Sequence, residues 1–499
     1  MRTKKAIINI ISSLILQIVT IICGLIIPKL IITTYGSKIN GLVTSITQFL
    51  AYITLIEAGF GPVIKSVLFK PIANNEKSEI EKILKASERI FKIISFIFIG
   101  YIILLCIILP LVLKREFDGL FTFSLIIIIS MSTFAEYYFG MTYKIFLQAN
   151  QSTHVVAVIQ LSTYILNTMA LILLIRLGAS IQVIKLTSTF IFVLRPVLQN
   201  IYVKKKYKIN LKNVNDNYNI KQKWEGLAQH IAYVVYNNAD IAILTLCGKI
   251  IDISVYSIYS LIVSNITKVI KSFNSGVDAT FGDMIAKGEK EKLNKCFKIY
   301  EGIYINVASI VFCSTLFLII PFVKLYTQGI TDANYTRPVF AYLIVITEFI
   351  FIIRQPYNDL VKVAGHFKQT KKGAYIESIL NIVISLALVW NFGLVGVTIG
   401  TLAAMPIRTI EIIYYASKYI LNRNVWYSFK RMTIIILEFL IITFVINFLP
   451  YIEINGYREW IVQAIIITFI SAIIVVSANS IIYKENVKNI IKRVKRKET

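Results

Sequence analysis

Residues 224–281 read WEGLAQHIAYVVYNNADIAILTLCGKIIDISVYSIYSLIVSNITKVIKSFNSGVDATF, and they predict two long apolar helices with a short break at residues 247–249. Each helix has one polar stripe, because steps of three and four residues return to one face of a 3.6-residue turn. The stripes are Gln229, Tyr233, Tyr236, Asn237 and Asp240, then Ser257, Ser260, Ser264, Lys268, Lys271 and Ser275. A charge in hydrocarbon is costly and normally faces a partner or water, so the stripes predict a functional site.

Apolar runs occupy nearly the whole chain of 499 residues, which is 56% hydrophobic and only 16% charged. A run of about 20 apolar residues is long enough to cross a bilayer. We therefore predict an all-α integral membrane protein with about fourteen transmembrane helices. The expected spans are residues 6–32, 41–69, 89–113, 119–147, 153–177, 180–203, 226–247, 252–281, 296–325, 338–364, 371–390, 394–416, 431–450 and 459–483. The weakest separations between neighbouring spans are at Gly178 and Gly393.

The net charge of +26 is distributed unevenly along the chain. If the N-terminus is cytoplasmic, most of the 53 Lys and Arg fall in loops on the cytoplasmic side. The positive-inside rule then predicts that both termini are cytoplasmic. Contact with anionic lipid headgroups accounts for the same charge, so nucleic acid is not an expected partner.

The two halves of the sequence look like copies of each other. Residues 73–83 (ANNEKSEIEKI) and 286–296 (AKGEKEKLNKC) have Ala, Glu-Lys and apolar residues at the same offsets, as in short amphipathic surface helices. Such a repeat predicts two six-helix lobes with a substrate near their interface. The expected organisation is an N-terminal lobe (1–205), a basic cytoplasmic linker (206–225), a C-terminal lobe (226–422), two accessory helices (423–484) and a basic cytoplasmic tail (485–499).

The sequence has none of the motifs that would indicate an enzyme. It has no Gly-rich phosphate-binding loop, no nucleophile elbow and no metal-ligand spacing of His, Cys and Asp. The five cysteines are scattered and predict buried core residues rather than disulfides or a metal site. We expect a transporter without cofactor or metal.

Four blocks of residues resemble a known family. They are Pro28-Lys29-Leu30 with Tyr35-Gly36-Ser37 and Asn40-Gly41-Leu42; Glu57-Ala58-Gly59-Phe60-Gly61; Asn238-Ala239-Asp240 with Ser254-Val255-Tyr256-Ser257-Ile258-Tyr259; and Arg354-Gln355-Pro356-Tyr357 with Gly365-His366-Phe367-Lys368-Gln369-Thr370, Glu377, Asn381 and Gly400-Thr401. In this order, the blocks resemble the oligosaccharide and polysaccharide flippases, of the O-antigen flippase kind, in the multidrug/oligosaccharidyl-lipid/polysaccharide (MOP) exporter superfamily. The resemblance covers essentially the whole predicted core.

This resemblance implies a flippase for cell-surface polysaccharide biosynthesis. Its cargo would be a lipid-linked oligosaccharide on a carrier of the undecaprenyl diphosphate type, moved across a bacterial cytoplasmic membrane by alternating access. The family fold is two six-helix lobes forming a V around a basic central cavity. Glycan polymerase and glycosyltransferases are the implied protein partners, and a monomer is the implied functional unit.

A diphosphate cannot leave water without compensating charge, so cations inside the spans are the first candidates for binding it. They are Lys268, Lys271, Arg354, Arg408 and Lys65. Structural alternatives exist for these residues. Arg408 could pair with Glu411 one turn on, and Arg354 with Glu348 or Asp359. Near a membrane edge, a lysine such as Lys271 or Lys65 can extend its ammonium to the headgroups.

Other polar residues are candidates for lining the cavity or for energy coupling. They are Asp240, Glu57, Asn237, Gln17, Tyr233 and Tyr236. A buried carboxylate that takes up H⁺ or Na⁺ is one way to build counter-transport. Equally, these acids could only neutralise nearby cations, as Asp240 would if it paired with Lys268.

Three rival functions stay open at this point. A lipid-linked peptidoglycan precursor flippase shares the same chemistry. A multidrug or cation exporter of the same superfamily would prefer an acidic, aromatic-lined cavity, whereas this chain has intramembrane Lys and Arg. A membrane scaffold for glycan-synthesis enzymes would not need intramembrane charges.

Overall fold

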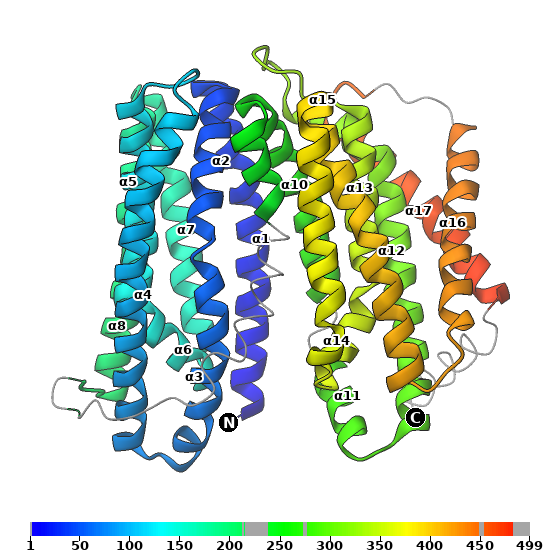
Figure 1. Cartoon of the computed structure of the whole chain (residues 1–499), viewed down its shortest axis with the longest axis horizontal. Helices are drawn as coiled ribbons and strands as arrows, with labels where there is room; N and C mark the ends of the chain where they lie inside the picture. The colour runs from blue at the N-terminus through cyan, green and yellow to red at the C-terminus, as the bar shows by residue number, and fades with distance from the viewer. Residues whose placement is uncertain (1, 212–213, 215–237, 273–276, 449–453, 483–499) are drawn as a thin grey trace. The chain divides into compact units, whose positions relative to one another are not determined.

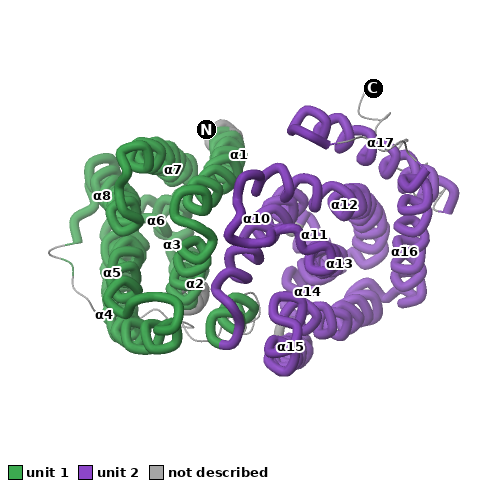
Figure 2. Tube along the Cα trace, turned by 90° about the horizontal axis from the view of Figure 1, so that it is seen from above, with its two compact units in different colours: residues 1–246 green, residues 247–499 purple. Residues whose placement is uncertain are grey.

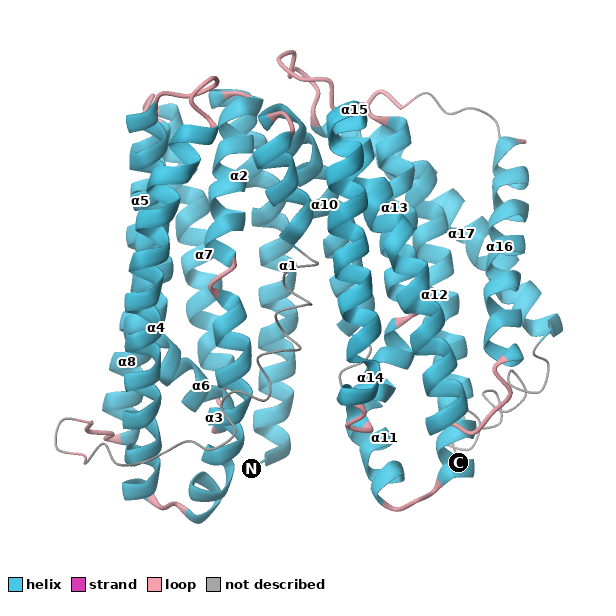
Figure 3. Cartoon of the chain, viewed as in Figure 1, coloured by secondary structure: helices cyan, strands magenta, loops and turns pink. Residues whose placement is uncertain are grey.

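Helices are the only regular elements in the part of the chain that the computed structural model describes, namely residues 2–211, 214, 238–272, 277–448 and 454–482 (Figure 3). Ten helical stretches within these residues are long and apolar enough to cross a membrane. A helix satisfies its own backbone hydrogen bonds, which is why such sequences span a bilayer as helices. The prediction of an all-α, multi-pass membrane protein is confirmed.

The chain divides into two compact units, residues 1–246 and residues 247–499 (Figure 2). The helices of the first unit are α1 (Arg2–Tyr35), α2 (Ser37–Ala51), α3 (Thr54–Asn74), α4 (Lys77–Val112), α5 (Gly119–Ala135), the π-helix η1 (Glu136–Gly140), α6 (Met141–Ala149), α7 (Thr153–Arg176), α8 (Ile181–Tyr207) and the helix Asn238–Cys247, which ends in the second unit. Within this unit α7 packs between α1 and α8, and α5 packs between α4 and α8; Figure 2 shows this order for the helices labelled in Figure 1.

The second unit contains the remaining helices. They are α10 (Ile250–Ser272), α11 (Val277–Ala286), α12 (Lys290–Tyr326), α13 (Pro338–Ile353), α14 (Gln355–Val363), α15 (Phe367–Tyr415), the π-helix η2 (Ala416–Ile420), α16 (Trp426–Asn447) and α17 (Tyr457–Ile482). Here α13 contacts α10, α12 and α15, while α17 packs on α12 and α16. The lobe, linker and tail boundaries expected from the sequence stay predictions.

Two expected elements differ from the structure. The span expected at 41–69 is divided into α2 and α3 by a turn at Tyr52. The amphipathic segments after the second and eighth spans are not separate surface helices, because α4 begins at Lys77 and α12 at Lys290 and both run on into the membrane span. The apolar faces of the first two turns are buried at Ile83 and Leu293, so packing extends each long helix.

The expected boundary at Gly393 is a reversal of the chain within α15. Gly393 has a φ of 50°, a left-handed conformation that glycine adopts without strain. The two halves then run side by side, and the amide of Asn381 donates to the hydroxyl of Thr401 over 2.7 Å. In the first unit Gly178, with a φ of 72°, occupies the corresponding place between α7 and α8.

In each unit the helix that follows a long helix, α4 or α12, is interrupted. In the first unit the interruption is η1, where Lys144 donates to Glu136 over 2.9 Å within the same helical stretch. In the second unit α13 ends before Arg354 and α14 begins after it, with Pro356 unable to donate a backbone hydrogen bond.

Candidate functional site

Charged side chains gather inside the second unit, on α10, α13 and α15. Lys271 of α10 and Arg354 both lie over the ring of Phe351, with Nζ at 4.2 Å and Cζ at 5.1 Å from the ring centre. The two charged centres are therefore no more than 9.3 Å apart. An aromatic face stabilises a cation, but two like charges this close also need an anion. We call Lys271, Phe351 and Arg354 the Phe351 platform.

Two carboxylates compensate the platform. Arg354 donates through Nη1 to Oε1 of Glu377 over 2.5 Å, and each side chain of this pair is only 7% exposed. Glu348 accepts a hydrogen bond of 3.0 Å from Thr267 and acts electrostatically on Lys271 and Arg354. The alternative that Arg354 pairs with Glu348 or Asp359 is therefore wrong, because its ion-pair partner comes from α15.

Arg408 is the third cation of this region. Its Nη1 donates to Oε2 of Glu411 over 2.6 Å and also to the carbonyl of Thr370. The expected pairing of Arg408 with Glu411 is confirmed. Arg408 also acts electrostatically on Glu377, so it belongs to the same charge cluster as Arg354.

Lys268 and Lys65 are less enclosed than these cations. Lys268 lies one turn before Lys271 on α10, and its side chain is exposed. Lys65 is half-buried on α3 in the first unit. Neither forms an ion pair or a hydrogen bond with a residue that the structure describes.

In the first unit, Asp240 lies on the helix Asn238–Cys247 and is 8% exposed. Neutral hydrogen bonds hold this helix to α2. The hydroxyl of Tyr52 donates to the carbonyl of Asn238 over 3.1 Å, and the hydroxyls of Ser45 and Thr245 are 2.9 Å apart. Asp240 is thus held next to a polar helix contact, and Tyr52 is one of its electrostatic neighbours.

The remaining candidates are described only in part. Gln17 is half-buried on α1, and its amide nitrogen has no hydrogen-bond partner among the described residues. Glu57 belongs to α3, but its side chain lies outside the described part of the structure. Asn237, Tyr233 and Tyr236 also lie outside the described residues.

A second buried ion pair was not expected from the sequence. Arg423 precedes α16, and its Nη1 and Nη2 donate to the two carboxylate oxygens of Glu301 on α12 over 2.9 and 3.1 Å. The hydroxyl of Tyr357 also donates to Glu301, and Nη2 of Arg423 donates to Ser428 over 2.8 Å. Glu301 and Tyr357 are fully buried. This network joins α12, α14 and α16, and its signal in the sequence was a lone Glu inside an apolar span.

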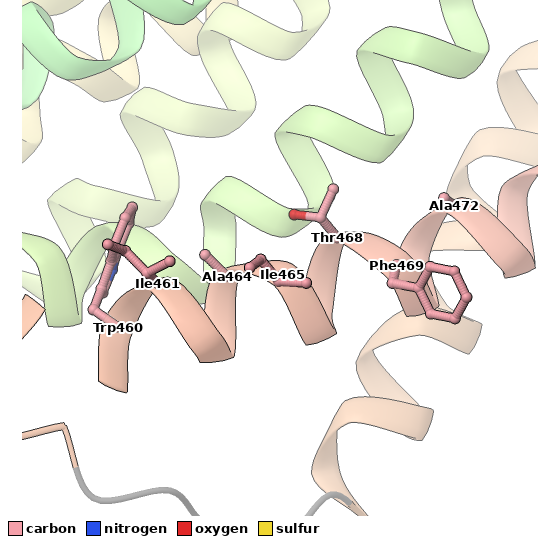
Figure 4. Close-up of a pocket in the computed structure, with 7 residues that line it drawn as sticks. All are labelled: Trp460, Ile461, Ala464, Ile465, Thr468, Phe469 and Ala472. Atoms are coloured by element: carbon pink, nitrogen blue, oxygen red, sulfur yellow. The ribbon is translucent and has the colours of Figure 1, made fainter. Parts of the chain in front are cut away.

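A hollow of about 500 Å³ lies along α17 (Figure 4). Trp460, Phe469 and their apolar neighbours on the same helix line it, and Thr468 is its one hydroxyl residue. Trp460 is fixed by a 3.1 Å hydrogen bond from its indole to the carbonyl of Leu318 on α12. Since no charged side chain lines this hollow, it is separate from the site at which charges gather.

Comparison of the sequence with protein-family models and with curated proteins finds no match. Solved structures do match. A lipid II flippase, MurJ, in an inward closed conformation aligns with a TM-score of 0.70 and 15% identity, over 96% of this chain and 100% of that chain. A multidrug resistance MATE family transporter of the MOP superfamily, in an inward-facing conformation, aligns with a TM-score of 0.58 and 14% identity, over 83% and 98% of the two chains.

This protein has the fold of these transporters. A further match is a MOP superfamily transporter from Pyrococcus furiosus, described by the reverse polarity of its binding pocket, with a TM-score of 0.50 and 13% identity over 83% of this chain and 96% of that one. Identities of this size establish the fold alone. Function has to be argued from the charged residues inside it.

Proposed function

We propose that this protein flips a polyprenyl diphosphate-linked oligosaccharide across a bacterial cytoplasmic membrane by alternating access. The observation that carries the proposal is the Phe351 platform, where Lys271 and Arg354 share one ring inside a membrane-spanning unit. Buried cations are costly in a membrane and are kept where they serve an anionic ligand or path. A diphosphate headgroup supplies the negative charge that these cations match.

The other cations have different places in the proposal. Lys268, exposed one turn from the platform, would meet the headgroup first. Arg408 would tune the charge of the cluster from its pair with Glu411. Lys65, on α3 of the first unit, stays a predicted substrate-binding cation. Glycan polymerase and glycosyltransferases are proposed neighbours in the membrane, and the monomer is the proposed working form.

The test is transport in phosphatidylcholine vesicles containing the purified protein. A fluorescent undecaprenyl diphosphate-linked disaccharide is placed in both leaflets, and a membrane-impermeant quencher reports the fraction that reaches the outer leaflet. We expect transport by the wild type, and reduced transport by Lys268→Ala and by Arg354→Gln. Absence of transport above protein-free vesicles would contradict the proposal.

A second candidate cargo is a lipid-linked peptidoglycan precursor, and the observation that favours it is the structural match to the lipid II flippase. Both cargoes present a polyprenyl diphosphate, so they differ in the sugar and peptide part. Competition between the labelled disaccharide and unlabelled lipid II separates them. Competition by a lipophilic organic cation instead would indicate drug export.

Energy coupling is proposed to use Asp240, which is 8% exposed in the first unit, with Glu57 as the second candidate. A carboxylate enclosed in a membrane unit can exchange H⁺ or Na⁺ as its surroundings change. We expect Asp240→Asn vesicles to lose the response of transport to an imposed H⁺ or Na⁺ gradient. A full response in the variant would remove Asp240 from the coupling mechanism.

A further inference from the structure

We propose that Glu377 is a built-in competitor of the cargo. In the protein without cargo, the carboxylate of Glu377 binds Arg354. When the cargo binds, the carboxylate leaves and the guanidinium binds the diphosphate headgroup instead. This inference rests on the proposed function and adds the event by which the site opens. The swap exchanges one oxyanion for another, so the buried arginine is never left without a counterion.

The bonding of Arg354 leaves room for a second oxyanion. A guanidinium carries several N–H donors in a planar fork that matches two oxygens of a carboxylate or phosphate. In the described structure Arg354 gives Glu377 only one hydrogen bond, through Nη1. Arg423, by contrast, donates to Glu301 through both terminal nitrogens. Arg354 is therefore held by a contact that a bidentate ligand can improve upon.

The bonding of Glu377 also permits its release. Among the described residues, Arg354 is its one side-chain hydrogen-bond partner. Glu348 differs, because Thr267 holds its carboxylate over 3.0 Å. When Glu377 leaves Arg354, Arg408 remains as a nearby cation that acts on the same carboxylate. Release of Glu377 therefore breaks one hydrogen bond and leaves its carboxylate near a second cation.

The platform matches the ligand in the number of its charges. Lys271 and Arg354 lie within 9.3 Å of each other over Phe351, and a diphosphate has two adjacent anionic groups. An internal competitor weakens the binding of that ligand. For a transporter this is useful, because the site must release its cargo on the far side as well as bind it.

Binding of inorganic pyrophosphate and of farnesyl diphosphate to the purified full-length protein, measured by calorimetry, tests the inference. Glu377→Gln keeps the size of the side chain and removes its charge. We expect this variant to bind both ligands about tenfold more tightly than the wild type, the effect of one charge-assisted hydrogen bond no longer contested. Arg354→Gln added to Glu377→Gln should abolish the gain.

Glu438→Gln is the matched control. Glu438 is a buried acid of the same unit, bonded to Asn479 on α17 rather than to the platform, and its removal should leave affinity at the wild-type value. Should Glu377→Gln not fold, as judged by size-exclusion chromatography, Glu377→Asp replaces it, with a smaller gain expected because the shorter side chain loosens the ion pair.

The outcomes separate this inference from the proposed function. If the Glu377 variant binds no more tightly than the wild type while Arg354→Gln still loses binding, the competitor role of Glu377 is wrong. The diphosphate site at Arg354 is then retained. An equal gain in Glu438→Gln overturns it as well, because the effect would then follow from total charge. Absence of binding by every form, wild type included, contradicts the proposed function itself.

Discussion

The surroundings of Arg354 and of Arg423 compensate a buried positive charge in different ways. Both arginines are buried in the second unit and each faces a glutamate. Arg423 makes two hydrogen bonds to Glu301 and others to Tyr357 and Ser428, so its contacts extend over three helices. Arg354 makes one hydrogen bond to Glu377 and shares the ring of Phe351 with Lys271.

The difference shows how a structural charge can be told from an exchangeable one. A buried ion pair stabilises a fold only when its geometry is good and its remaining donors are satisfied. The Arg423 network meets that condition in most of its atoms, whereas Arg354 at the Phe351 platform makes one hydrogen bond to its carboxylate and has donors to spare. The dense bonding of Arg423 fits a joint between helices, and the single hydrogen bond of Arg354 fits the proposed exchangeable contact.

The largest expected effect is on stability, at the network of Arg423 and Glu301. Arg423→Met would leave Glu301 fully buried without its cation, at a cost of about 3–5 kcal/mol in the free energy of unfolding. Thermal and denaturant unfolding in detergent micelles measure the loss. The double variant Glu301→Gln/Arg423→Met should recover most of it, since no uncompensated charge remains. A single variant as stable as the wild type would remove the distinction between the two arginines.

The next effect is on transport. Arg354→Gln should lower flipping of the labelled cargo about tenfold or more, the value of a charge-assisted hydrogen bond, while unfolding changes less than in Arg423→Met. The vesicle assay and the same unfolding measurements give both numbers. Arg354→Lys is the companion variant, and it should have intermediate activity because it keeps the charge and loses the planar fork. Equal losses of stability at the two arginines would count against separate roles.

The smallest effect is expected in the first unit. Arg195 on α8 donates to the hydroxyl of Thr163 over 2.7 Å and lies over the rings of Tyr164 and Phe192 at 4.4 and 4.2 Å. Its bonded partners there are neutral, so Arg195→Met should cost only about 1 kcal/mol of unfolding free energy.

Arg195→Lys, measured beside it, should be nearly as stable as the wild type. A loss in Arg195→Met as large as that of Arg423→Met would show that burial of the arginine, and not the carboxylate left behind, sets the cost.

The sequence was sufficient for what local patterns control. Apolar runs located the helices, and the glycines at 178 and 393 marked two chain reversals because positive φ angles favour glycine. The pairing of Arg408 with Glu411 could be predicted because residues three apart share a helix face. These features depend on residues close together in the chain.

What the sequence did not reveal depends on contacts between distant segments. Glu377 is 23 residues from Arg354, and Glu301 is 122 residues from Arg423, so no periodicity links either pair. Packing of helices creates these pairs. The lone Glu301 within a long apolar run was the one hint available, since an unpartnered acid is rarely kept in a membrane.

The reversal at Gly393 also governs which way the rest of the chain faces. A straight helix of the 49 residues of α15 would extend about 70 Å, more than twice the hydrocarbon thickness of a bilayer. Folded back at Gly393, it accounts for two crossings instead of one. If the turn failed to form during insertion, the chain would cross the membrane one time fewer. The segments that follow, α16, α17 and the basic C-terminus, would then have the inverted membrane topology. One glycine therefore fixes the topology of about a hundred residues that follow it.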